Sequence, residues 1–234
     1  MNGMNQEFNG YHGYADKEAA VRKTMLGVYG WMTFALMISA IVGIYIATDY
    51  NLLYTLSSTS AYWIFAIAEV VVVIAISARA HKMSSGAAKA WFIVYAVLNG
   101  VTFGSIFAIY GLGIAGYAFL VTAITFAVMT IYGYVTKTDL SKIGNLFFMA
   151  LIGLLIATVF NMIFPIEGFS LAIMYVGIVI FIGLIGWDTQ QIKQLAYAES
   201  EGMVKNASIV GALTLYLDFI NIFIRIVSIL GRDD

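Results

Sequence analysis

Residues 169–188 read FSLAIMYVGIVIFIGLIGWD, and this stretch decides the fold class because its first charged residue is Asp188. About 20 consecutive apolar residues are enough to cross the hydrocarbon core of a bilayer as a helix. The whole chain agrees, since 62% of its 234 residues are hydrophobic and only 11% are charged. Soluble domains average about 45–50% apolar and about 25% charged residues. The sequence therefore predicts an integral membrane protein built from α-helices.

Hydropathy outside this stretch predicts a bundle of seven transmembrane helices. The first 20 residues are polar and Gly-rich and lack the apolar segment of a secretory signal, so residues 1–20 are expected to form a flexible cytoplasmic tail. Residues 21–234 are expected to form a single membrane domain. The predicted spans are roughly 26–48, 60–78, 90–110, 113–135, 143–165, 169–188 and 207–230.

Basic residues predict the orientation, because Lys and Arg near the ends of spans stay on the cytoplasmic side. Ten of the 12 lie before the first span or in every second loop: Lys17, Arg22, Lys23, Arg79, Lys82, Lys89, Lys137, Lys142, Lys193 and Lys205. This pattern predicts a cytoplasmic N-terminus and an external C-terminus. Arg225 and Arg232 would lie at the far side, so a half-inserted seventh helix with a cytoplasmic C-terminus is an open alternative.

Composition argues against several function classes. The chain has no cysteine, which argues against disulfides, thiolate metal sites and thiol catalysis. Its net charge of −1 gives no basic surface for nucleic acid. His12 and His81 lie outside the predicted spans, where solvated side chains are expected rather than ligands. We therefore expect no cofactor and no nucleic-acid partner.

Ionisable residues within the predicted spans are the candidate functional residues, because each charge at mid-bilayer costs about 2.5–3.5 kcal/mol on insertion scales. Glu69 lies midway along the second span, and Asp188 lies at the cytoplasmic end of the sixth. Asp218 lies about halfway along the seventh span and is followed by Arg225. Each of these side chains needs a partner, a wet cavity or a bound proton.

The seventh span carries polar residues at intervals of three and four, which places them on one helical face. This pattern predicts a helix at the centre of the bundle, with a polar stripe toward the interior and an apolar surface elsewhere. A structural seam satisfied by neighbouring helices and one wall of an ion path both fit. The stripe consists of Gly211, Thr214, Asp218, Asn221, Arg225, Ser228 and Arg232.

Asp188 and Asp218 are predicted to lie on adjacent antiparallel helices and could meet across the bundle. Two neighbouring carboxylates cannot both be ionised cheaply, so such a pair would titrate as one unit and could act as a pH sensor. Contact requires the sixth helix to continue past Gln191. Arg79, at the cytoplasmic end of the second span, is a candidate cation to compete for the ionised pair.

Four segments resemble the Bax inhibitor-1 family, also called transmembrane Bax inhibitor motif or lifeguard-type proteins, in its bacterial branch. They are Val28-Tyr-Gly-Trp-Met-Thr33, Tyr132-Gly-Tyr-Val-Thr-Lys-Thr-Asp-Leu-Ser141, Trp187-Asp-Thr-Gln190 and Ser208-Ile-Val-Gly-Ala-Leu-Thr-Leu-Tyr-Leu-Asp-Phe-Ile-Asn-Ile-Phe223. The last two are the most specific, because they carry the family's paired aspartates at Asp188 and Asp218. Trp187 stands where the family usually has Tyr.

The resemblance implies a seven-helix bundle with a central last helix and a pH-sensitive calcium leak gated by the aspartate pair. It also implies a latch arginine, which we place at Arg79, and it suggests Glu69 as a contact for the ion. Thr214, Asn221 and Arg225 are further candidates for the ion path. Eukaryotic relatives suppress cell death, and some bacterial relatives restrain a membrane AAA protease. Calcium prefers oxygen ligands, so transient contacts with Asp188, Asp218 and Glu69 fit its chemistry.

Three alternatives differ in class from a leak channel. A polytopic regulator would use the aspartates for folding or for recognition of other membrane proteins. A proton-coupled carrier would use them as a relay. An aspartyl intramembrane protease also pairs two carboxylates, but it would carry Gly-x-Gly-Asp where this chain has Leu215-Tyr-Leu-Asp218. We therefore expect a membrane protein that is not an enzyme, resident in the bacterial inner membrane.

Overall fold

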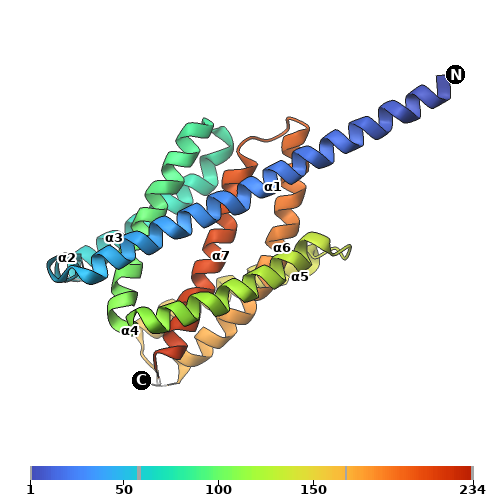
Figure 1. Ribbon diagram of the computed structural model, residues 1–234. Helices are drawn as coiled ribbons and strands as arrows, with labels where there is room; N and C mark the ends of the chain where they lie inside the picture. The colour runs from blue at the N-terminus through green and yellow to red at the C-terminus, as the bar shows by residue number, and fades with distance from the viewer. Residues whose placement is uncertain (1, 57–58, 167, 233–234) are drawn as a thin grey trace.

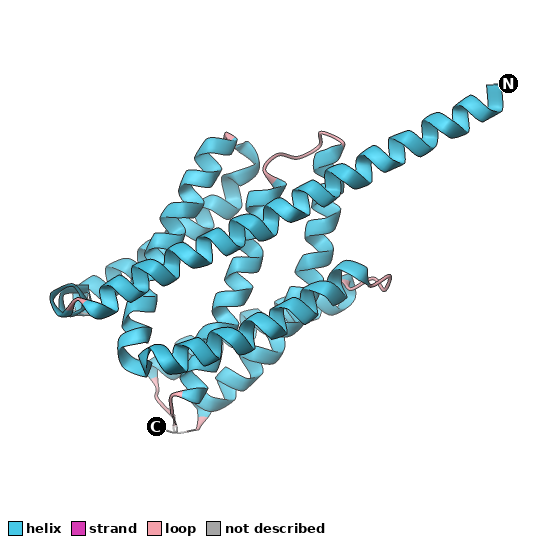
Figure 2. Ribbon diagram, in the orientation of Figure 1, coloured by secondary structure: helices cyan, strands magenta, loops and turns pink. Residues whose placement is uncertain are grey.

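The computed structural model is all-helical over the residues it describes, which are 2–56, 59–166 and 168–232 (Figures 1 and 2). Side chains are described within these ranges except at 2–15, 59–63, 66 and 81, so the predictions for His12 and His81 lie outside the described side chains. The elements are α1 (Asn2–Thr48), α2 (Tyr50–Leu56), α3 (Thr59–Arg79), the 3₁₀ segment η1 (Ala80–Lys82), α4 (Ser85–Val135), α5 (Ser141–Ile163), α6 (Phe169–Ser200) and α7 (Ala207–Leu230).

All seven predicted apolar stretches are helical, and two of them lie within α4. This helix has 51 residues, which at 1.5 Å per residue is more than twice the roughly 30 Å of a bilayer core. It is interrupted at Gly111, whose φ of 76° lies in the left-handed region that favours glycine. The break falls between the predicted spans 90–110 and 113–135. The short helix α2, with seven residues, was not predicted.

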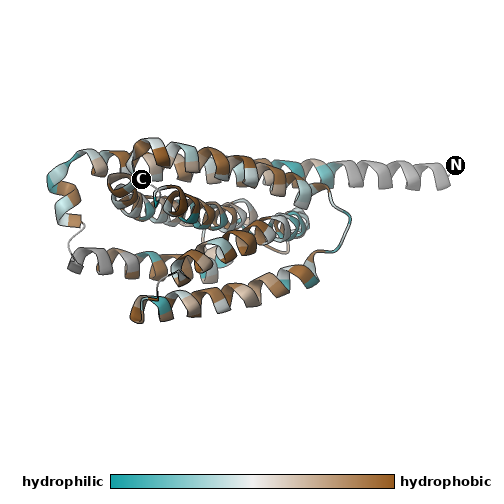
Figure 3. Ribbon diagram, turned by 90° about the horizontal axis from the view of Figure 1, so that it is seen from below, coloured by the Kyte–Doolittle hydropathy of each residue, from teal (hydrophilic) through white to brown (hydrophobic). Residues whose placement is uncertain are grey.

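Five helices in the described part of the chain are long and apolar enough to cross a membrane. They are α1 from Asp16 onward, α4, α5, α6 and α7. Figure 3 shows hydrophobic residues along most of their length. The chain is therefore a multi-pass helical membrane protein, whereas the count of seven spans and the cytoplasmic N-terminus stay predictions.

Two predicted boundaries differ from the structure. Helix α1 begins at Asn2, so residues 2–20 are helical and project beyond the other helices in Figure 1, and the flexibility expected for residues 1–20 stays a prediction. The predicted span 169–188 was too short, because α6 continues to Ser200. The extension is polar overall but keeps helical periodicity, since Ile192 and Ala196 are buried against the bundle. Asp188 therefore lies inside a helix rather than at its end.

Helix α7 is the most buried of the five long helices. Half of the residues in its apolar segment are buried, against a third or less in each of the others. It packs against α1, α4 and α6. Its apolar residues are largely buried as well, because α1, α4 and α6 surround it. Leu215, Tyr216 and Ile222 are fully buried, and Tyr216 contacts Ser39 of α1 and the rings of Phe92 and Tyr95 of α4.

Candidate functional site

Small residues allow α6 to approach its neighbours closely around Asp188. A Cβ atom on Gly133 of α4 would collide with the backbone carbonyl of Gly186 in α6. A larger residue at position 133 would therefore force α4 and α6 apart. A Cβ atom on Gly211 of α7 would lie 2.7 Å from a side-chain carbon of Ile192. Close backbone approach at small residues is a usual way for membrane helices to associate. The contact of Gly211 with Ile192 belongs to the α6–α7 interface and sets its register one turn beyond Asp188.

This register brings Asp188 of α6 against Asp218 of α7. The two carboxyl groups lie close enough to influence each other. Asp218 is only 4% exposed, and Asp188 is partly buried. Two neighbouring carboxyl groups cannot both be ionised cheaply in such surroundings. The site is therefore a pair of adjacent acids inside the bundle.

Three buried polar atoms without a hydrogen-bond partner belong to the aspartate pair or to its neighbours along α6. Within the described side chains, five such atoms occur, and these three belong to Trp187, Thr189 and Asp218. Buried polar groups normally have a hydrogen-bond partner, which can be an ordered water. The Oδ2 of Asp218 and the hydroxyl of Thr189 could accept such a bond from water.

Gln190 joins two motifs that lie about 50 residues apart in the sequence. Its Oε1 accepts a hydrogen bond from the backbone N–H of Leu140 at 2.9 Å, and its Nε2 donates to the carbonyl of Thr138 at 2.9 Å. One helical turn further along, Lys193 Nζ donates to the carbonyl of Tyr134 at 3.1 Å. The α4–α5 connection is therefore held against the turn of α6 that carries Asp188.

The polar stripe of α7 faces α6 over much of its length, but most of its groups bond within their own helix. The hydroxyl of Thr214 donates to the carbonyl of Val210, and Asn221 Nδ2 donates to the carbonyl of Leu217. Serine and threonine commonly satisfy themselves in this way in membrane helices. These contacts favour the structural interpretation for Thr214 and Asn221. Asp218 differs, because its partner lies on another helix.

Arg225 lies two turns beyond Asp218 and contacts no carboxylate among the described side chains. Its Nη1 donates to the carbonyl and to Oδ1 of Asn221, at 2.7 and 3.1 Å. The guanidinium lies 4.9 Å from the centroid of the Phe181 ring, and Gly177 leaves the space that it occupies. A cation over an aromatic face is stabilised by the ring quadrupole. Arg225 is thus a positive charge within the α6–α7 interface.

Glu69 lies apart from the aspartate pair. It is partly buried on α3, and one of its oxygens accepts a hydrogen bond from the hydroxyl of Thr102 on α4 at 2.6 Å. No group of three or more His, Cys, Asp or Glu side chains forms a metal site in the described part of the chain. Asp188, Asp218 and Glu69 therefore do not form one cation site in this conformation. Glu69 can contact an ion only at a separate step.

Arg79 is also away from the pair. Its side chain is exposed at the end of α3 and makes no hydrogen bond or ion pair with Asp188 or Asp218. The structure thus brings together the two aspartates but not the proposed latch. A latch at Arg79 would require α3 to move toward α6.

Sequence reasoning missed a buried hydroxyl network between α1, α4 and α7. Ser39 of α1 and Tyr216 of α7 are both fully buried, and their oxygens lie 2.6 Å apart. The hydroxyl of Ser39 also lies within donating distance of two backbone carbonyls, those of Ala35 at 3.0 Å and Ala96 at 2.7 Å. The partners are distant in sequence, so no local pattern could have revealed them.

Comparisons with known proteins agree with the motifs of the two aspartate helices. The family model described as inhibitor of apoptosis-promoting Bax1 matches residues 21–234. The chain is 39% identical over 218 residues to the inner membrane protein YbhL of Escherichia coli, covering 92% of this chain and 93% of that protein. An uncharacterized protein of Borreliella burgdorferi is 37% identical over 213 residues, covering 90% and 92% of the two chains. The chain therefore belongs to the Bax inhibitor-1 family, among its bacterial inner-membrane members.

Proposed function

We propose that the protein is a pH-sensitive cation leak of the bacterial inner membrane, with calcium as the permeant ion and the Asp188–Asp218 pair as the gate. The observation that carries this proposal is the close approach of two carboxyl groups inside the bundle, where no ion pair with a described Lys or Arg side chain forms. A structural seam needs only hydroxyl and amide groups, so acids that persist at this cost point to protons or cations.

In this proposal the pair shares one proton, and loss of that proton would change the α6–α7 contact. Two adjacent carboxylates repel each other in a medium of low dielectric constant. The helices would then separate at this point or recruit a cation, which is the role we assign to Arg79 or to the permeant ion. The bundle can respond there, because Thr189 and Asp218 already carry polar atoms without partners.

We further propose that α7 is the central helix of the gate. It has the highest buried fraction of the five long helices, and it packs against three of the others. Glu69 lies on α3, which packs against α4, and it accepts a hydrogen bond from Thr102 of that helix. In this proposal it is a second acid that the ion meets at a separate step.

The test is calcium flux into dye-loaded liposomes between about pH 6 and 8, with the wild type and Asp218→Asn compared. A gate that binds one proton changes its equilibrium by up to about tenfold per pH unit. We expect pH-dependent flux in the wild type and flux without that dependence in Asp218→Asn and Asp188→Asn, because asparagine cannot exchange a proton in this range.

Asp139→Asn is the matched control. Asp139 lies in the α4–α5 connection, outside the spans, and the backbone N–H of Ser141 holds the pKa of its carboxyl below the usual value. It therefore stays ionised over the tested range and cannot contribute to the response. Flux in Asp218→Asn that kept the full pH dependence would overturn the gate. No flux from folded protein at any pH would favour the regulator, and saturable counterflow would favour a carrier.

A further inference from the structure

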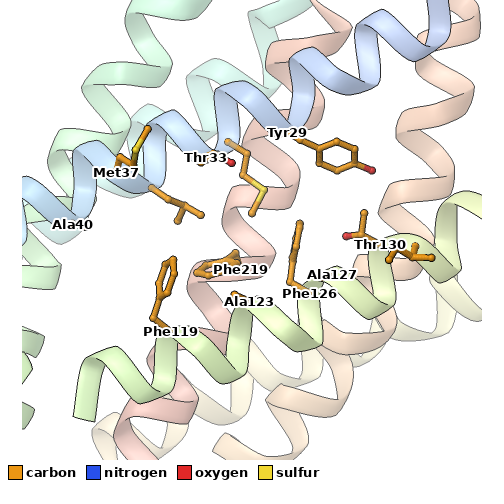
Figure 4. Close-up of a pocket in the computed structure, with 13 residues that line it drawn as sticks. Tyr29, Thr33, Met37, Ala40, Phe119, Ala123, Phe126, Ala127, Thr130 and Phe219 are labelled. Carbon is orange, nitrogen blue, oxygen red and sulfur yellow. The ribbon is translucent and has the colours of Figure 1, made fainter. Parts of the chain in front are cut away.

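An apolar cavity lies between α1 and the second half of α4 (Figure 4). Its volume is about 480 Å³. Met37 and Ala40 of α1 line one wall, Ala123 and Ala127 of α4 line the other, and Phe219 of α7 forms the floor. Phe219 directly follows Asp218, so the floor adjoins the aspartate pair.

The cavity continues in both directions along α1. Toward the break in α4, a cavity of about 350 Å³ shares Leu36 and Phe119 with it. Toward the start of α1, a cavity of about 360 Å³ shares Tyr29 and Thr130 and reaches Arg22. The three form one groove, which we call the α1–α4 groove.

The groove is open at its side. Met37 and Phe119 at its rim are 52% and 47% exposed, and Ile131 is 62% exposed. All three are apolar and lie on helices that are apolar enough to cross a membrane. In a bilayer this opening faces acyl chains rather than water.

The basic end of the groove differs in chemistry. A polar cavity of about 420 Å³ there is lined by Arg22, Lys193, Tyr134 and Tyr197, with Glu18 as its one acid. Arg22 is exposed and makes no ion pair with a described side chain. Lys193 Nζ lies 4.6 Å from the ring centroid of Tyr134 and donates to its carbonyl, so this cation is held in place. The net charge of these groups is +1.

The part of the groove between Arg22 and Leu36 matches one leaflet in length. Arg22 and Leu36 are 14 positions apart, or about 21 Å along a helix. A leaflet with its headgroups is about half of 40–45 Å. A groove that joins a cationic mouth to an apolar slot over this distance has the dimensions of a phospholipid with one extended acyl chain.

We propose that the α1–α4 groove binds a glycerophospholipid of the surrounding bilayer, with its phosphodiester between Arg22 and Lys193 and one acyl chain in the slot above Phe219. Charge complementarity favours a phosphate at the mouth. An apolar peptide or a second copy of the chain would leave these two cations without an anion.

The experiment is native mass spectrometry of the full-length protein released from mild detergent after addition of dioleoyl phosphatidylglycerol. Dioleoylglycerol, which has the same chains without the phosphate, is added in a parallel arm. We expect the double variant Arg22→Gln, Lys193→Gln to retain about tenfold less phospholipid than the wild type, with retention of dioleoylglycerol unchanged. Ala127→Phe, which fills the slot, should lower retention of both lipids.

Matched controls separate the groove from general effects. Lys137→Gln, Lys142→Gln removes one basic charge in the α4–α5 connection and one in the first turn of α5, and Ala108→Phe adds a ring at an exposed position of α4 that does not line the groove. Both should retain lipid as the wild type does. Equal losses in the control and groove variants would overturn the proposal, as would unaltered retention in Ala127→Phe that folds normally. Neither readout depends on ion flux, so a failure here leaves the aspartate gate untouched.

Discussion

Helices α5 and α7 differ far more in their packing than in their length or apolar character. They have 23 and 24 residues, and each is apolar enough to cross a bilayer. Yet 6% of the apolar segment of α5 is buried, against 50% in α7. Lipid is as apolar as leucine, so burial in a membrane protein is decided by packing and polar contacts rather than by hydropathy.

The buried helix α7 also carries more charged residues inside the bundle than the lipid-facing helix α5. Helix α7 carries Asp218 and Arg225 inside the bundle, whereas the only charged residue of α5 is Lys142 in its first turn. Ionisable groups at membrane depth need protein or water around them. The helix that is enclosed by three neighbours can hold such groups, and the helix that faces lipid cannot. The contrast therefore links packing to function.

Leu215→Ala on α7 and Leu155→Ala on α5 give the largest contrast in stability. Leu215 is fully buried and Leu155 is 57% exposed. We expect Leu215→Ala to lower the free energy of unfolding by about 2–4 kcal/mol through the cavity it leaves, and Leu155→Ala to change it by less than about 0.5 kcal/mol. Unfolding in lipid bicelles measures both. Equal losses would break the comparison, because they would mean that α5 is packed in the membrane as α7 is.

Two glycines test where α5 does touch the bundle. A Cβ atom on Gly144 would collide with the ring of Trp187 in α6, while one on Gly153 would have no neighbour within 4 Å. Overpacking costs about 1–3 kcal/mol, so Gly144→Ala should destabilise the protein by this amount. Gly153→Ala should be neutral or slightly stabilising, because alanine favours helix. The same unfolding measurement applies. A neutral Gly144→Ala would show that this end of α5 is as free as its middle.

Hydropathy alone predicted the helices, because a polar backbone in lipid must satisfy its hydrogen bonds within each segment. The break at Gly111 was also readable, since two glycines separate the apolar runs there. The extension of α6 beyond Asp188 was not predicted, because most of its residues are polar. Ile192 and Ala196 are its buried apolar residues, and two such positions are a weak signal of a helix. The two aspartates could be selected as candidates because acidic residues are rare in membrane spans. The Ser39–Tyr216 contact joins residues 177 positions apart and has no signal along the chain.

The smallest expected effect concerns Asp139, an exposed acid just before the start of α5. Asp139 Oδ1 accepts a hydrogen bond from the backbone N–H of Ser141 at 2.9 Å, and this bond holds the pKa of the carboxyl below its usual value. A carboxyl with a depressed pKa stabilises the folded state when ionised, so the contribution is present above its unfolded pKa and lost as the pH falls through its folded pKa.

We expect the amide resonance of Ser141 to titrate between about pH 5 and 2, around and below the reference Asp pKa of about 3.9, and to stay constant in Asp139→Asn. Because Asp139 is fully exposed, the α5 backbone should otherwise be unaffected. A Ser141 resonance that titrated near pH 6 to 8 would contradict the assignment and would remove Asp139→Asn as a control for the gate. The exposed acid and the enclosed pair would then respond in the same range, and the contrast between α5 and α7 would no longer separate an acid in an exposed turn from the proposed pH sensor.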